Sequence, residues 1–183
     1  MDLMIDENAN KGEYFEEERS GKGVAAMIKE VAKLFRKDLV FIEEAKDSDD
    51  IFNKVGKELF EKGLVNEDFV EAVKAREKDY PTGLDLSVVG EKIPNVAIPH
   101  TESEYCKAKN VVVVKLKDEI EFNNMISPDN KLKVKFLFMI LNNEKEAQSN
   151  ILSHLMEFFT QNDNIKNLCE INNTEEMYKY ITE

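Results

Sequence analysis

Hydrophobic residues first recur at helical spacing in the segment that begins at Val24. Apolar side chains stand three and four positions apart there, at Val24, Met27, Ile28, Val31, Leu34 and Phe35. A stripe with that period predicts an amphipathic helix over residues 24–35. Four consecutive apolar residues, 39–42, follow it and predict a short strand. We therefore expect an N-terminal helical segment over residues 24–38, followed by the main domain over residues 39–183.

Two more helices are predicted between residues 47 and 79. Acidic residues at 47–50 favour a helix start, and Gly63 is placed to end that helix. Its expected inward face consists of Ile51, Phe52, Val55, Leu59 and Phe60. Asn66 is expected to cap the next helix, whose inward residues are Phe69, Val70 and Val73.

The second half of the chain alternates between strand and helix patterns. Three of the four prolines lie in residues 81–99, which predicts an irregular stretch that ends in a short strand before His100. Residues 111–116 and 134–141 predict buried strands, residues 147–159 predict a long helix, and Thr174 is expected to cap a last helix. Strands that follow one another directly, among helices, indicate a layered α/β (α+β) sandwich with a mixed sheet.

Charge excludes several classes of partner. The 183 residues suffice for one domain with a real core, and their net charge is −12. That charge opposes binding to nucleic acid or to an anionic membrane surface, both of which need clustered Lys and Arg. No apolar run is long enough to insert into a membrane. Residues 1–20 hold seven acidic residues, so we expect residues 1–23 to form a disordered acidic tail.

Few side chains in this sequence are candidates for a reactive or ligand-binding role. The cysteines, Cys106 and Cys169, are expected to be reduced thiols in a cytoplasmic protein. His100 follows an apolar strand and precedes a polar loop, where sheet proteins carry reactive groups, although a histidine without a role is equally compatible with that position. His154 lies on the apolar face of a predicted helix and is expected to border the core. The spacing of these residues predicts no metal site, and no phosphate-binding glycine motif is present.

Arg76 is a candidate with two interpretations. Near the C-terminus of its helix it is favoured by the helix dipole alone. Its planar guanidinium is also suited to holding an oxyanion such as phosphate. Thr82 and Gly83 are typical of a turn, but their hydroxyl and N–H groups are equally able to face an anion.

Two motifs together resemble a known family. The stretch Arg76-Glu77-Lys78-Asp79-Tyr80-Pro81-Thr82-Gly83-Leu84, followed by Ile98-Pro99-His100-Thr101, is similar to the enzyme IIA domain of the bacterial sugar phosphotransferase system, fructose/mannitol superfamily. The sequence of these motifs, together with Phe122-x-x-Met125 and Ala147-Gln148, is most similar to the galactitol-type branch. The resemblance covers roughly residues 39–183. It implies a three-layer sandwich with a mixed sheet of about five strands and helices on both faces.

The resemblance also implies an activity. It implies that His100 takes a phosphoryl group from the histidine-containing phosphocarrier protein and passes it to a cysteine of a IIB domain during uptake of a galactitol-like or fructose-like sugar. It assigns Arg76 to the phosphoryl oxygens and suggests hydroxyl donors at Thr82 and Thr101. It requires no cofactor. Cys106 is expected to be a bystander, because the family's cysteine belongs to IIB.

One position departs from the family. Many relatives carry a second histidine two residues before the glutamine that corresponds to Gln148, and this chain has Glu146 there. A carboxylate there is able to orient His100, but it also repels a phosphoryl group.

Two other functions are compatible with the same domain. A regulatory IIA-like module of a transcription antiterminator is the alternative that the predicted helix before residue 39 favours. A nitrogen-related signalling protein ranks below it, because its wording usually lacks the Tyr80–Leu84 sequence.

Overall fold

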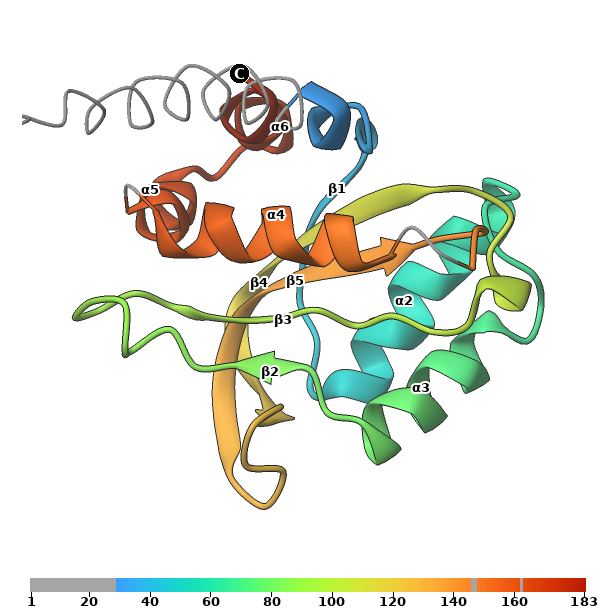
Figure 1. The fold of residues 1–183 in the computed structure, drawn as a ribbon, viewed down its shortest axis with the longest axis horizontal. Coiled ribbons are helices and arrows are strands. Elements are labelled where there is room, and N and C mark those ends of the chain that lie inside the picture. Colours follow the sequence, from blue (N-terminus) through green and yellow to red (C-terminus); the bar gives the residue numbers. More distant parts are fainter. Residues whose placement is uncertain (1–28, 146–147, 162) are drawn as a thin grey trace, which may run out of the picture.

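The computed structural model describes residues 29–145, 148–161 and 163–183 (Figure 1). Residues 29–32 are helical and lead into the first strand. The elements are, in order, β1 (Phe35–Glu43), α2 (Ser48–Glu61), α3 (Phe69–Asp79), β2 (Gly83–Leu84), β3 (Asn95–Ala97), the 3-10 turn η1 (Ser103–Tyr105), β4 (Asn110–Asn123), β5 (Lys131–Leu141), α4 (Gln148–Thr160), α5 (Asn164–Glu170) and α6 (Thr174–Thr182). The expected acidic tail and residues 24–28 of the expected N-terminal helix lie outside the described residues.

The five strands form one sheet in the order β1-β4-β5-β3-β2. Strands β4 and β5 form an antiparallel pair, and β1 lies parallel to β4. Strand β3 lies parallel to β5, and the short β2 is antiparallel to β3. The prediction of a mixed sheet of about five strands is confirmed.

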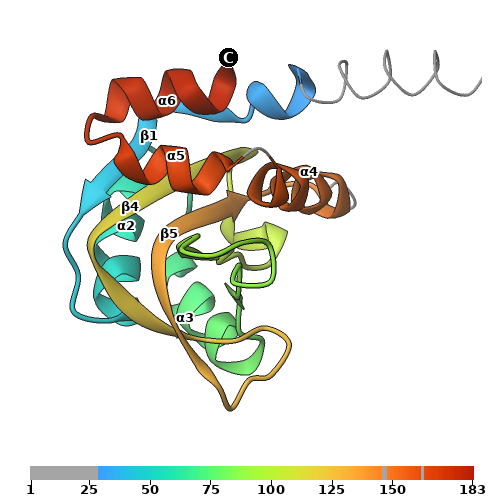
Figure 2. The same cartoon turned by 90° about the vertical axis from the view of Figure 1, so that its left-hand side faces the viewer.

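Helices cover both faces of this sheet. Because successive strand residues point to opposite faces, Val112 and Val114 of β4 pack in one core cluster with α2 and α3, whereas Val111 and Val113 pack in a second cluster with α4, α5 and α6. Figure 2 shows the two groups of helices on either side of β4 and β5. The predicted three-layer sandwich is confirmed. No helix within the described ranges is both long and apolar enough to cross a bilayer.

The start of β1 corrects the predicted boundary between helix and strand. The strand begins at Phe35, whereas the sequence predicted helix to residue 35 and a strand from Leu39. Val111 N–H donates to the Leu34 carbonyl at 3.0 Å, so the chain already pairs with β4 at this point. The exposed charged residues 36–38 conceal this pairing in the sequence, because they interrupt the apolar pattern.

The helices predicted after residue 46 are found, with local corrections at their ends. Gly63 has a φ of 72° just after α2, in the left-handed conformation expected of a helix-ending glycine. Asp68 holds the N-cap position of α3 but makes no side-chain cap bond, whereas Asn66 Oδ1 accepts from Asp68 N–H at 3.1 Å just before the helix. The side chain that caps α6 is that of Asn173 instead of Thr174. Phe60, which was expected to face inward, is 51% exposed. Helix α5 was not predicted.

A buried lysine joins the sheet to the C-terminal helices. Lys115 of β4 is 4% exposed, and its Nζ donates to the carbonyl oxygens of Cys169 and Ile171, at 2.6 and 2.7 Å. It also donates to Asn172 Oδ1 at 2.9 Å. One ammonium group therefore provides hydrogen-bond donors to acceptors at the end of α5 and in the turn that leads to α6.

We expect Lys115→Met to destabilise the fold, because it removes three charge-assisted hydrogen bonds, to two half-buried carbonyl groups and to the Asn172 side chain. The free energy of unfolding in urea should fall by about 2–4 kcal/mol. Lys117→Met replaces an exposed lysine of the same strand, so it is the matched control and should change this free energy by less than about 0.5 kcal/mol. Equal unfolding free energies for Lys115→Met and the wild type would show that the three hydrogen bonds contribute nothing.

Candidate functional site

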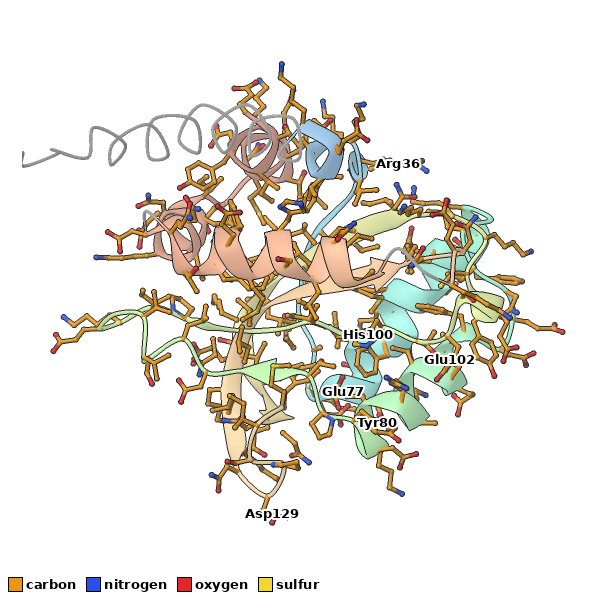
Figure 3. All side chains as sticks on the ribbon, in the orientation of Figure 1. Arg36, Glu77, Tyr80, His100, Glu102 and Asp129 are labelled. Atoms are coloured by element: carbon orange, nitrogen blue, oxygen red, sulfur yellow. The ribbon has the colours of Figure 1, made fainter. Side chains whose placement is uncertain are left out.

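His100 lies beside β5, close to that strand's C-terminal end. After β3 the chain continues along β5, where Ile140 N–H donates to the Pro99 carbonyl at 3.0 Å and His100 forms a parallel bridge with Ile140. The Pro99 ring has no N–H to donate, so regular pairing ends there. The half-buried His100 ring is thus placed at the edge of the sheet, where Figure 3 shows it near Glu102 and above the end of α3.

The position of the His100 ring defines its tautomer. Its Nδ1 lies 2.9 Å from the Ile98 carbonyl oxygen. Because a carbonyl oxygen only accepts, Nδ1 carries the proton and Nε2 of the neutral ring keeps its lone pair. Burial lowers the pKa of His100, as does the charge of Arg76, against the opposing effects of the Ile98 carbonyl and Glu102. The lowered pKa favours the neutral ring, with Nε2 unprotonated.

Arg76, in the last turn of α3, presents its guanidinium next to this ring. Its Nη1 donates to Glu102 Oε1 at 3.3 Å, and its guanidinium carbon lies 4.4 Å from the centroid of the Tyr80 ring. Its Nε is buried and has no hydrogen-bond partner among the described residues. The guanidinium thus lies over an aromatic face and keeps donor capacity for an oxyanion.

The two candidate threonines are both buried, and each donates to a carboxylate. Thr82 N–H and Oγ1 donate to Glu77 Oε1 and Oε2, at 2.8 and 2.7 Å. Thr101 Oγ1 donates to Glu102 Oε2 at 2.7 Å. Burial raises the pKa of Glu77 to about 7, although the hydrogen bonds from Thr82 lower it.

A close backbone contact accounts for the glycine after Thr82. A Cβ at Gly83 would lie 2.5 Å from the Asn123 carbonyl oxygen, and Met125 N–H donates to the Gly83 carbonyl at 2.8 Å. Only glycine lets β2 approach the end of β4 this closely. The contact helps to fix the position of Thr82.

The structure brings His100, Arg76 and Thr101 together. Thr82 is connected to His100 through Ile98, whose N–H donates to the Thr82 carbonyl at 3.2 Å. Sequence reasoning missed Glu102 as the partner of Arg76, and Glu77 as the partner of Thr82. The position of Glu77 directly after Arg76 was the available signal for it. No sequence signal could identify the Ile98 carbonyl as the partner of His100, since every residue has a backbone carbonyl. The last candidate, Glu146, lies outside the described residues.

The other residues considered have different surroundings. Burial raises the pKa of the Cys106 thiol, which disfavours the reactive thiolate and agrees with a bystander. His154 is half-buried on α4, with Nδ1 3.9 Å from Glu157 Oε2. It lines a cavity of about 190 Å³ with residues of α4 and α6. Among the described residues, no group of histidine, cysteine and acidic side chains is arranged to hold a metal ion.

A neutral imidazole beside a stacked guanidinium is suited to transfer of an anionic group such as phosphoryl. The model of the family "Phosphoenolpyruvate-dependent sugar phosphotransferase system, EIIA 2" matches residues 33–183. The chain therefore belongs to this family of phosphoryl carriers, and the resemblance stated from the sequence is confirmed. Among curated relatives, the galactitol-specific EIIA component of Escherichia coli (strain K12) is 24% identical over 136 residues, which cover 74% of this chain and 86% of the relative.

Solved structures share the fold. The mannitol-specific cryptic phosphotransferase enzyme IIA CmtB from Escherichia coli superposes with a TM-score of 0.64 at 17% identity, over 83% of this chain and 97% of its own. A second match is to the complex of enzyme IIAMTL and phosphorylated enzyme IIBMTL from Escherichia coli, with a TM-score of 0.61 at 19% identity. That match covers 79% of this chain and 94% of the solved chain.

Proposed function

We propose that His100 is the phosphoryl acceptor, that the histidine-containing phosphocarrier protein is the donor, and that a cysteine of a IIB domain receives the group. The hydrogen bond from His100 Nδ1 to the Ile98 carbonyl is the observation that supports this most strongly. It leaves Nε2 unprotonated on the neutral ring.

The transfer step requires an in-line attack at phosphorus. The Nε2 lone pair forms the new N–P bond while the bond from phosphorus to the donor nitrogen breaks. The other ring proton remains on Nδ1, hydrogen-bonded to the Ile98 carbonyl. Charge on the phosphoryl oxygens is stabilised by the Arg76 guanidinium, whose buried Nε lacks a partner among the described residues. Onward transfer reverses this geometry, with a thiolate as the attacking group.

The proposed partners follow from the comparisons. The solved complex pairs a IIA domain with phosphorylated IIB, which supports a IIB domain as the acceptor for this chain. The galactitol-specific relative supports a galactitol-like sugar for the pathway that this chain supplies, with a fructose-like sugar as the alternative.

Reconstituted transfer tests the proposal. Phosphoenolpyruvate and the upstream proteins of the system are supplied with labelled phosphate, and label is followed on His100, on the IIB cysteine and on sugar. We expect it to reach the IIB cysteine. Label that stays on His100 with every IIB domain tested would instead support the regulatory function.

Glu102 is expected to oppose the proposed transfer. Its carboxylate accepts a hydrogen bond from the Arg76 guanidinium that the phosphoryl group needs, with Glu102 Oε1 3.3 Å from Arg76 Nη1. Replacing it with the neutral amide in Glu102→Gln removes a like charge near the incoming group. We expect the phosphorylation rate to rise about three- to tenfold, the size expected for one partly screened charge. Stopped-flow or quench measurements of labelling provide the rate.

Glu104→Gln is the matched control, because it removes one exposed carboxylate two residues further on. Its rate should stay within about twofold of the wild type. A marked fall in rate for Glu102→Gln alone would mean that Glu102 assists the transfer, and the proposed displacement of its carboxylate would be wrong.

A further inference from the structure

A continuous set of hydrogen bonds connects α3 to the His100 ring. The carboxylate of Glu77 accepts from Thr82 N–H at 2.8 Å and from Thr82 Oγ1 at 2.7 Å. The Thr82 carbonyl accepts from Ile98 N–H at 3.2 Å, and the Ile98 carbonyl lies 2.9 Å from His100 Nδ1. The Thr82–Ile98 bond extends the β2–β3 ladder, in which Gly83 pairs with Ala97.

The burial of this carboxylate indicates more than a surface contact. Glu77 is half-buried, its pKa is raised by burial to about 7, and it forms no salt bridge with any described residue. A carboxylate without a cationic partner is destabilised by burial, and here only the Thr82 donors offset that cost. Thr82 itself is 4% exposed, so water does not compete for its hydroxyl group.

We propose that Glu77 is a positioning residue that holds the His100 ring in its nucleophilic orientation through Thr82 and Ile98. By fixing Thr82, Glu77 fixes the plane of the Ile98 peptide and the direction of its carbonyl. That carbonyl keeps the proton on Nδ1 and directs Nε2 outward. The last turn of α3 thereby positions two groups, since Arg76 reaches Glu102 while Glu77 holds the loop behind His100. The expected effect of Glu77 on phosphoryl transfer rests on the proposed function, but its expected effect on the tautomer of the His100 ring does not.

The ring is tested directly by nitrogen NMR of the unphosphorylated protein. Chemical shifts of His100 Nδ1 and Nε2 report which nitrogen carries the proton. We expect a single tautomer in the wild type, a mixture in Glu77→Ala, and a return to the single tautomer in Glu77→Gln, whose amide is able to hydrogen-bond both Thr82 groups. Thr82→Val keeps the volume and loses the hydroxyl group, and it should show the same change to a smaller extent. Thr82→Ser should resemble the wild type.

The matched control is Glu71→Ala on the same helix, where the lost carboxylate pairs with Lys74 at 3.0 Å. It should leave the His100 shifts unchanged. Wild-type shifts in folded Glu77→Ala would overturn the proposal. If Glu77→Ala does not fold, wild-type shifts in Thr82→Val overturn it in the same way.

Kinetics test the second consequence. Phosphorylation of Glu77→Ala at saturating phosphocarrier protein should be about tenfold slower, with KM for the phosphocarrier within about twofold, because Glu77 acts through the ring and not on the partner. Glu77→Gln should recover most of the rate. A mixed tautomer with an unchanged rate would overturn the role in transfer. Absence of label on wild-type His100 would overturn the proposed function, while the NMR shifts would still decide the role of Glu77.

Discussion

His100→Ala should abolish phosphorylation by the phosphocarrier protein, with a loss of at least about 1,000-fold in initial rate. The substitution removes the ring nitrogen that we propose as the phosphoryl acceptor, and alanine offers no nucleophile. The wild-type label should be acid-labile and base-stable, as a phosphoramidate is. Label incorporation after rapid quenching, followed by treatment at low and at high pH, provides the measurement.

His154→Ala is the matched control for this variant, because it removes the second of the two histidines. His154 lies on α4 beside Glu157 and belongs to a different surface of the molecule. Its loss should leave the labelling rate within about twofold, since it contacts no residue of the site. Labelling of His100→Ala at the wild-type rate would exclude His100 as the acceptor.

Arg76→Lys should slow phosphorylation by roughly 10- to 100-fold even though the positive charge is retained. The guanidinium presents several donors in one plane, and its central carbon lies over the Tyr80 ring, 4.4 Å from the ring centroid. A lysine ammonium is a single flexible point charge that cannot offer two parallel donors to two phosphoryl oxygens. The single-turnover rate with phosphorylated carrier protein measures the effect.

Arg36→Lys is a suitable control for the same chemical change. Arg36 also pairs with a carboxylate, since its Nη2 lies 2.7 Å from Asp38 Oδ2, but it lies on β1, far from His100 in Figure 3. Its rate should be that of the wild type. Equal rates for Arg76→Lys and the wild type would mean that Arg76 serves only the helix dipole.

The sequence predicted the elements with continuous apolar runs and missed those that depend on pairing. Strand β5 and the first half of β4, residues 111–116, were found because their β-branched and aromatic residues are buried on both faces. The start of β1 was missed because the exposed residues 36–38 look like a loop. Strand β2 has two residues, so it carries no periodic pattern at all, and its pairing with β3 is a tertiary contact.

The candidate site was predictable where it rests on motif residues and not where it rests on backbone groups. His100 and Arg76 were identified by the resemblance, and the structure places them together. The Ile98 carbonyl, which holds the ring, has no sequence signal. Glu102 was read as part of a polar loop, because its contact with Arg76 spans 26 positions and forms only in the folded chain.

We expect His100 to carry the phosphoryl group on Nε2. Uniformly nitrogen-labelled protein, phosphorylated with phosphoenolpyruvate and the upstream proteins of the system, should show phosphorus–nitrogen coupling at one histidine nitrogen. We expect that nitrogen to be Nε2 of His100, with Nδ1 still protonated against the Ile98 carbonyl. Coupling at Nδ1 of His100, or at any other residue, would contradict the account.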